Sequence, residues 1–390
     1  MFDASMRFPI HITIGVLSLF LFLTGLEVDA QVQTDTLTPQ EAAALQKKLD
    51  RELKKSQRKT SFQILPIVYY TPETDLAFGA TAIYMFKMHQ KDSLLPFSQI
   101  QPSFIYTLNK QVLGTVHYQL YPNRNWVFMG KVGYLVYPYF FSGIGNTHDL
   151  SYKEWYDATY PVLKINAYRK ISPKGLSAGL RYRYQNTQIT SSPDSLLGHG
   201  NVPGERGSVQ SALGFGFKYN TTDFTGSPTK GWYVNAYTMW NSTSWGGDYN
   251  DQILLLDARK YLTISKKKDV LALQVFAQSH TGDVPFNLMS MLGGRYRMRG
   301  YQEGIYRDRQ MHVYQLEYRS RLFFKYFGFV LFGNYGGIGN DFDEVTSNYR
   351  YTLGTGLRFT PLPEKRYFVR LDYAIGDGTQ GFYIEIGEAF

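Results

Sequence analysis

From Phe62 to the end of the chain, the hydrophobic pattern has a period of two in one segment after another, and this period constrains the fold more than any other feature. Around 176–185 and 209–219, apolar side chains alternate with small, polar or charged ones. Successive side chains of a β-strand point to opposite faces, so the pattern predicts strands with one apolar and one polar face. About sixteen such segments follow one another, an even number that suits a bacterial barrel.

The expected strands are separated by turns and by a few longer connections. They lie near 62–70, 75–87, 98–108, 111–121, 126–137, 159–170, 175–186, 207–219, 231–241, 250–263, 269–280, 309–321, 326–335, 349–360, 365–375 and 381–390. If both ends of the barrel chain face the periplasm, the long connections around 138–158, 187–206, 282–308 and 336–348 fall outside. Long outer loops and short inner turns are typical of outer-membrane barrels.

Alternation alone would also fit a soluble β-sandwich, whose apolar face forms the core. The composition favours a membrane barrel, because the chain has 32 Tyr and 27 Phe in 390 residues and no apolar run beyond residue 30 that could span a bilayer as a helix. Barrels place aromatic girdles at both membrane interfaces. We therefore expect residues 62–390 to form an all-β, transmembrane antiparallel β-barrel in contact with outer-membrane lipid.

The N-terminus predicts export. Arg7 precedes an apolar run from Ile10 to Leu26, and Val28-Asp29-Ala30 suits cleavage before Gln31, so residues 1–30 are predicted to be a signal peptide. A single membrane-anchoring helix is the weaker alternative. Together with a barrel, this segment predicts the outer membrane of a Gram-negative bacterial cell.

Residues 31–61 are predicted to be a short periplasmic leader with one charged helix from Ala42 to Lys55. The basic run from Lys47 to Lys59 is read as a solvated periplasmic segment, with a specific anionic partner as the alternative. The chain has a formal net charge of +9, but the remaining basic residues are spread through the strands, so no nucleic-acid partner is expected.

The sequence predicts neither an enzyme nor a bound cofactor or metal. The chain contains no cysteine, which excludes disulfides and thiolate ligands. Acids at Asp341, Asp343 and Glu344 could bind a cation, but a charged, soluble loop is the simpler explanation. The histidines are scattered, and these are never paired at metal-ligand spacing: His117, His148, His199, His280 and His312.

The last predicted strand carries Phe382, Ile384, Ile386 and finally Phe390 on one face. A terminal aromatic residue on a lipid-facing strand suits both closure of the barrel seam and recognition by the barrel-insertion machinery. These four residues are therefore predicted to serve the seam.

The connection 282–308 contains Gly293-Gly294-Arg295-Tyr296-Arg297-Met298-Arg299-Gly300-Tyr301. Here the sequence resembles the BamA/TamA-like family of outer-membrane assembly and translocation barrels, often called bacterial surface antigens. That family has sixteen strands and a hydrophobic-Arg-Gly-aromatic motif in its sixth extracellular loop, which folds back into the lumen. Met298, Arg299, Gly300 and Tyr301 stand at that place.

The resemblance also implies partners for Arg299 on the next two strands. Glu317 lies on the polar side of the first, and the family's Phe-x-Asp-x-Gly appears on the second as Phe332, Asn334 and Gly336, with an amide in place of the acid. A bidentate Arg299–Glu317 pair would tether the loop, and Gly300 would allow a sharp turn. Alternatively, 299–301 is only a solvated loop tip.

The resemblance covers about 62–390, including an opening strand at Leu65–Thr74 and a turn at Tyr219–Gly231. It implies assembly or export of client outer-membrane proteins, with a weak seam between 62–70 and 381–390 that opens laterally. The family's assembly and secretion members carry periplasmic POTRA repeats, which we expect this chain to lack, so other assembly subunits would have to recruit clients.

Two other functions are open from the sequence. One is a small-solute pore that favours anions through inward Arg181, Arg183, Arg358 and Arg370. The other is a scaffold subunit without activity of its own in a larger outer-membrane complex.

Overall fold

The computed structural model describes residues 60–89, 92, 94–146, 152–190, 196–265, 269–361, 363 and 366–390. The predicted signal peptide and the predicted periplasmic helix lie outside these residues. Among the described residues, no helix is both long enough and apolar enough to cross a membrane. The first strand begins at Thr60, two residues earlier than predicted.

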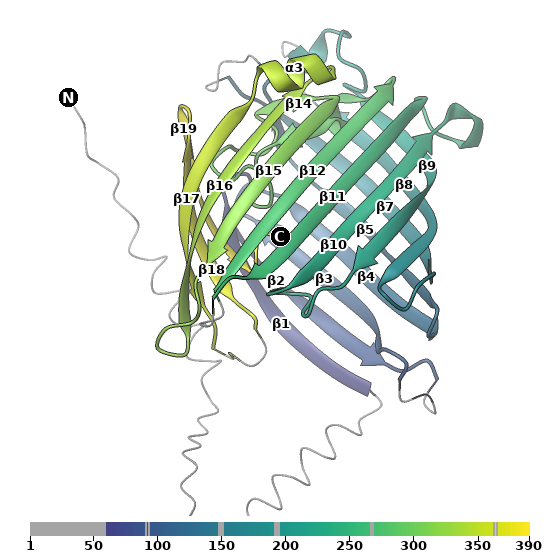
Figure 1. Cartoon of the computed structure of the whole chain (residues 1–390). Helices are drawn as coiled ribbons and strands as arrows, with labels where there is room; N and C mark the ends of the chain where they lie inside the picture. Colours follow the sequence, from purple (N-terminus) through teal and green to yellow (C-terminus); the bar gives the residue numbers. More distant parts are fainter. Residues whose placement is uncertain are drawn as a thin grey trace, which may run out of the picture. The chain divides into compact units, whose positions relative to one another are not determined.

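Sixteen antiparallel strands close into a barrel, in which each strand pairs with its neighbours in the sequence and β1 meets β19 at a seam (Figure 1). The strands are β1 (Thr60–Thr71), β2 (Asp75–Phe86), β3 (Ser98–Thr107), β4 (Val112–Asn123), β5 (Trp126–Val136), β7 (Glu154–Lys170), β8 (Leu176–Thr190), β9 (Gly207–Asn220), β10 (Gly231–Asn241), β11 (Asp251–Thr263), β12 (Val270–Gly282), β15 (Gln310–Arg319), β16 (Phe327–Gly339), β17 (Arg350–Phe359), β18 (Val369–Gly376) and β19 (Thr379–Ile386).

This confirms the predicted antiparallel barrel. The main differences are in length: β8 ends at Thr190, opposite Asp157 of β7, and β7 begins at Glu154, because its first three residues pair with residues 139–141. The "loop end" is the end of the barrel at which β5, β8, β12 and β16 end, and the "turn end" is the opposite one.

Short elements at the loop end interrupt the long connections. They are β6 (Tyr139–Phe141), η1 (Leu196–Gly198), η2 (Thr243–Trp245), η3 (Phe286–Leu288), β13 (Ser290–Leu292), β14 (Tyr306–Asp308) and α3 (Phe342–Ser347). β6 continues the pairing along β7, and β13 with β14 forms a separate two-stranded hairpin within the connection 283–309.

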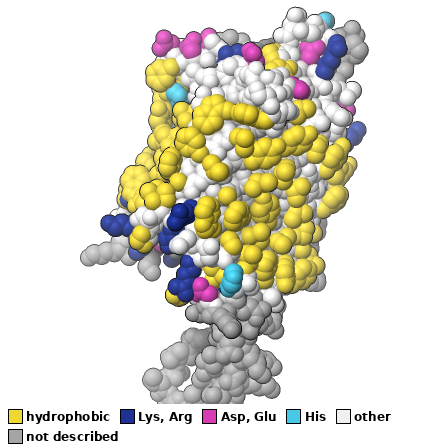
Figure 2. Space-filling view, turned by 90° about the vertical axis from the view of Figure 1, so that its right-hand side faces the viewer, with side chains coloured by type: hydrophobic (Ala, Val, Ile, Leu, Met, Phe, Trp, Pro, Cys, Tyr) yellow, Lys and Arg dark blue, Asp and Glu magenta, His cyan; other side chains and the backbone are white. Residues whose placement is uncertain are grey.

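The outer surface is apolar. Figure 2 shows hydrophobic side chains over the middle of the face in view and charged side chains gathered toward the two ends. Leu180, Phe104 and Leu353 are among the large apolar side chains exposed on strands. In water such a surface would be unfavourable, whereas in a bilayer it faces lipid.

A large apolar cluster lies within the barrel at its loop end. Connections and strand ends contribute its aromatic members, including Phe140 from β6, Phe286 from η3 and Tyr301 from the connection 283–309. The Phe141 and Phe286 rings meet edge to face with centroids 5.1 Å apart. The lumen at this end is therefore packed with side chains.

The end of the chain differs from the prediction. β19 stops at Ile386, because Gly387 adopts a positive φ of 97°, although its N–H still donates to the Phe368 carbonyl oxygen in register with the β18–β19 ladder. The chain then turns inward. Phe390 is buried beside Tyr261 and Ala272 on the lumenal side, so it does not share the lipid-facing side with Phe382 and Ile386.

Candidate functional site

The connection 283–309, named loop 6 below, turns back into the barrel. Its tip, 295–301, reaches the side chains of β15, β16, β18 and β19. Two residues of the tip have left-handed backbone, Met298 at φ 53° and Gly300 at φ 111°. A Cβ on Gly300 would lie 3.2 Å from the Thr352 side chain, so both the backbone conformation and the space favour glycine there.

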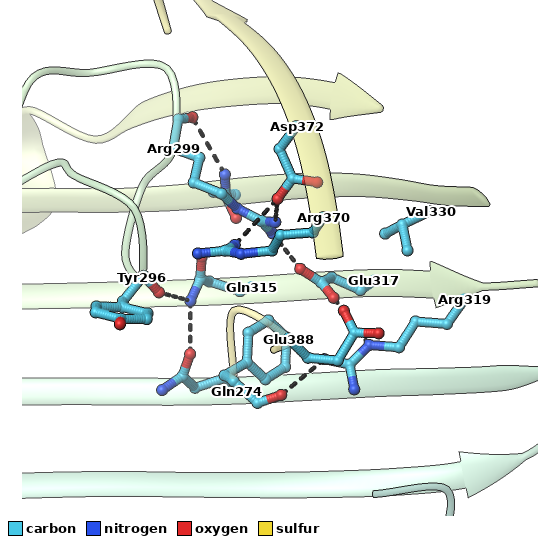
Figure 3. A network of polar contacts seen from close by, with 12 residues as sticks. Gln274, Tyr296, Arg299, Gln315, Glu317, Arg319, Val330, Arg370, Asp372 and Glu388 are labelled. Carbon is cyan, nitrogen blue, oxygen red and sulfur yellow. Dashed lines mark hydrogen bonds and ion pairs between the residues drawn. The ribbon is translucent and has the colours of Figure 1, made fainter. Parts of the chain in front are cut away.

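Arg299 is the centre of the site and is fully buried (Figure 3). Its Nη2 forms an ion pair with Glu317 on β15, and its Nη1 lies 2.6 Å from the Asp372 carboxylate on β18. The guanidinium also lies over the Phe332 ring, 3.6 Å from the centroid. A buried guanidinium needs opposite charge and hydrogen-bond acceptors, and this site supplies two carboxylates and an aromatic face.

Further arginines complete the charge balance around the two carboxylates. Arg319 donates to Glu317 from Nε at 2.9 Å. Arg358 and Arg370 both contact Asp372, at 2.5 Å and 3.0 Å. Because each carboxylate accepts from more than one arginine, the loop tip is built into a network that joins three strands of the barrel wall.

The network extends into the last residues of the chain. Arg358 Nε donates to Glu388 at 2.8 Å, and Arg319 Nη2 donates to the Phe390 carbonyl oxygen at 2.7 Å. The Phe390 ring also lies 5.3 Å from the Arg319 guanidinium. The inward turn after β19 thus places Phe390 within the same network as the loop tip.

Most of the residues predicted for the loop tether are brought together. Met298 and Tyr301 are buried in the apolar cluster, and the Gly300 N–H donates to the Tyr383 hydroxyl at 3.1 Å. The predicted pairing of Arg299 with Glu317 is present, but it is not bidentate, because the guanidinium divides its nitrogens between two acids. Gly336 lies further along β16 opposite Val313, and no described contact joins it to Arg299.

Asn334 occupies the position of the family's acid without contacting the guanidinium. Its Nδ2 donates to the Thr352 hydroxyl at 2.7 Å and, at 3.5 Å, to the Arg299 carbonyl oxygen. The second carboxylate comes instead from Asp372, which was not predicted as a partner. Its place on the polar side of the segment 365–375 was the one signal in the sequence that could have identified it.

A second contact holds loop 6 at the loop end of β1. The Glu303 N–H donates to the Glu73 carboxylate at 2.8 Å, and Gln302 Nε2 reaches the Pro72 carbonyl oxygen at 3.4 Å. Burial and the nearby charge of Glu303 raise the pKa of Glu73 above its ordinary value. The turn 72–74 and loop 6 are therefore joined by two hydrogen bonds, one of which the Glu73 carboxylate accepts.

A family model described as the Omp85 superfamily domain matches residues 87–390, which include the loop, its arginine and both carboxylates. The chain belongs to the Omp85 superfamily. No curated protein matched this Omp85 chain.

Solved structures of other Omp85-like barrels share the fold at low sequence identity. BamA from Haemophilus ducreyi, lacking POTRA domains 1–3, aligns with a TM-score of 0.60 at 12% identity over 95% of this chain and 81% of that one. CdiB from Acinetobacter baumannii gives 0.56 at 14% over 87% and 67%, and CdiB from Escherichia coli gives 0.54 at 9% over 87% and 70%.

Arg299→Ala is expected to destabilise the barrel by about 3 kcal/mol, because it leaves two buried carboxylates with less compensation. Heat-resistant migration of the folded band on a gel should be lost at a lower temperature. Arg206→Ala, at an exposed loop arginine, is the control and should migrate as the unmodified chain does. Equal migration of the two variants would contradict a tether at Arg299.

Asn334→Asp is expected to destabilise this chain, although it restores the family's acid. The new carboxylate would be the third near Arg299, and the donor to Thr352 would be lost. In an Asp372→Asn background, Asn334→Asp should lower the free energy of unfolding by less, because the number of acids near Arg299 is then unchanged and one acid has only changed place from β18 to β16. A double-mutant cycle of unfolding free energies measures this coupling, and strictly additive effects would argue against a shared arginine.

The contact between Glu73 and Glu303 is expected to weaken as pH rises. The pKa of the Glu73 carboxyl is raised when loop 6 is docked, so the docked state is favoured fully below the ordinary glutamate pKa of about 4.3. This contribution to docking is lost as pH rises through the pKa of the docked state. Amide exchange of 302–304, corrected for intrinsic rates, should therefore show less protection at higher pH. Glu73→Gln should remove this dependence, whereas Glu154→Gln, at the first residue of β7, should leave it in place.

Proposed function

We propose that this Omp85 barrel resides in the outer membrane of a Gram-negative cell and assists the assembly or export of other outer-membrane proteins through its seam. The observation that carries the proposal is the pairing of the first and last strands. β1 and β19 are joined at one register position, Tyr70 opposite Ile384. By contrast, β1 pairs with β2 from Thr60 to Thr71.

A seam of this kind leaves backbone N–H and C=O groups of two strand edges without a ladder partner. Unpaired edges are templates for another strand, and strand addition is a general mode of peptide recognition. In a closed barrel of this family, the seam is the place where a client strand could add with the least disruption. This supports the seam as the site of client contact.

Loop 6 touches both sides of the seam from the inside. Arg295 forms an ion pair with Glu385 on β19, and its guanidinium lies 5.0 Å from the ring centroid of Tyr69 on β1. Six residues before Glu385, at the start of β19, Thr379 donates to the Gly300 carbonyl oxygen at 2.9 Å. Since the ladder between β1 and β19 is short, these contacts supply much of what holds the seam closed.

A small-solute pore is less well supported. The apolar cluster fills the loop end of the lumen, and Arg358 and Arg370 are engaged by Asp372, so they add little free positive charge. Among the described residues, no group of three or more His, Asp or Glu side chains could hold a metal ion. We propose no catalytic role, and we expect partners to be client barrels or other assembly subunits.

Covalent closure of the seam is expected to abolish the activity. The chain has no cysteine, so Tyr70→Cys with Ile384→Cys introduces a single possible disulfide between opposed residues. In cells that depend on the variant, outer-membrane protein levels should fall under oxidising conditions and recover with reductant.

The control places the same kind of bond between strands that remain paired. Leu371→Cys with Ile384→Cys joins β18 to β19, where the two residues are also opposed. It should have no effect on outer-membrane protein levels. If the seam disulfide forms completely and outer-membrane proteins still accumulate normally, the proposed opening is wrong.

A further inference from the structure

Four basic side chains form a row across the lumenal wall on the strands that loop 6 does not lock. His117 on β4 is opposite Lys131 on β5, Lys131 is opposite Lys164 on β7, and Lys164 is opposite Arg183 on β8. Val132, Ile165 and Leu180 on the same strands are exposed on the outer face, so the row points inward. This set is named the lumenal basic row.

The row carries more positive charge than the barrel neutralises, since Asp251 on β11 acts on Arg183 without forming an ion pair with it. In the part of the chain that the structure describes, every ion pair involves other residues. Like charges directly opposite each other destabilise an antiparallel sheet. Folding alone would favour neutral polar side chains, as in Gln99 opposite Gln119 on β3 and β4.

Neutral groups hold the neighbouring cations in place. Arg181 donates to the Tyr168 hydroxyl at 2.8 Å and lies 3.7 Å from the Tyr237 ring centroid, and Lys218 lies 4.6 Å from the Tyr168 ring. Arg183 donates to the Gln185 side chain at 2.8 Å. Aromatic faces and an amide oxygen orient these cations without cancelling their charge.

Donors in and beside the row are left for a ligand. The Nε atoms of Arg181 and Arg183 are buried and have no hydrogen-bond partner among the described residues. His117, at the other end of the row, is exposed although it faces the lumen, so the space beside that end of the row is open to solvent, and Lys131, Lys164 and Arg183 are half-buried. Oriented, uncompensated donors next to accessible space are what an anion site requires.

We propose that the lumenal basic row binds a ligand that carries two or more phosphate groups. Neighbouring strands are about 4.8 Å apart, a step that one phosphate can bridge with different oxygens. Acidic side chains on one face of an extended peptide are about 6.6 Å apart and fit this step less well. The phosphates could belong to the headgroup of a membrane glycolipid or to a free polyphosphate.

The test measures calorimetric binding of sodium tripolyphosphate to the purified full-length chain in a zwitterionic detergent. The variant Lys131→Gln/Lys164→Gln/Arg183→Gln should bind at least tenfold more weakly. The control Lys110→Gln/Lys170→Gln/Lys174→Gln removes the same charge from exposed positions and should bind within twofold of the unmodified chain. Equal loss in both variants, or no loss in either, would overturn the proposal.

Two further measurements complete the design. Without ligand, the triple variant of the row should keep its heat-resistant migration on a gel, because removing opposed like charges relieves repulsion. If the triple variant folds poorly, Lys131→Gln alone provides the test and should bind tripolyphosphate more weakly than the unmodified chain, with a smaller loss than tenfold. Tetraglutamate that binds as tightly as tripolyphosphate, and with the same dependence on the row, would refute a phosphate site.

Competition identifies the source of the phosphates. Displacement of tripolyphosphate by a diphosphorylated glycolipid, but not by its dephosphorylated form, supports a lipid headgroup, whereas no displacement supports a free polyphosphate. The inference does not depend on the assembly proposal, since it concerns the opposite wall and is measured without a client.

Discussion

The buried guanidinium of Arg299 is the constraint on which the rest of the lumen depends. A charge removed from water is stable only beside compensating charge, so its position requires acids on the strands that surround the loop tip. Glu317 and Asp372 meet that requirement from β15 and β18. With the tip held there, the remainder of loop 6 lies within the barrel, where its apolar side chains can pack with those of β6 and η3.

The two walls of the lumen follow different electrostatic rules. On β15 to β19, arginines and carboxylates alternate in space and largely cancel, which makes that wall a rigid support for the loop. On β4 to β9, basic residues of the wall face one another, contact aromatic and amide groups, and form no ion pair among the described residues. A structural role accounts for the first arrangement, whereas the second costs stability and therefore calls for a ligand or another use.

The sequence predicts what depends on local periodicity. Alternation located all sixteen strands, and the polar phase of β15 placed Glu317 in the lumen. It could not predict Asp372 as a partner, because that contact arises only when β18 closes around the loop tip. The apolar cluster was also missed, since irregular connections have no period, and the inward turn of Phe390 depends on the single backbone conformation of Gly387.

Arg295 gives loop 6 a second role besides filling the lumen. Its contacts with Glu385 and Tyr69 cross the seam, while Arg299, four residues later, is anchored in the wall. Undocking of the loop and separation of β1 from β19 are therefore thermodynamically coupled. A ligand that binds only the docked loop and a strand that binds only the open seam must weaken each other by the same factor, whichever arrives first.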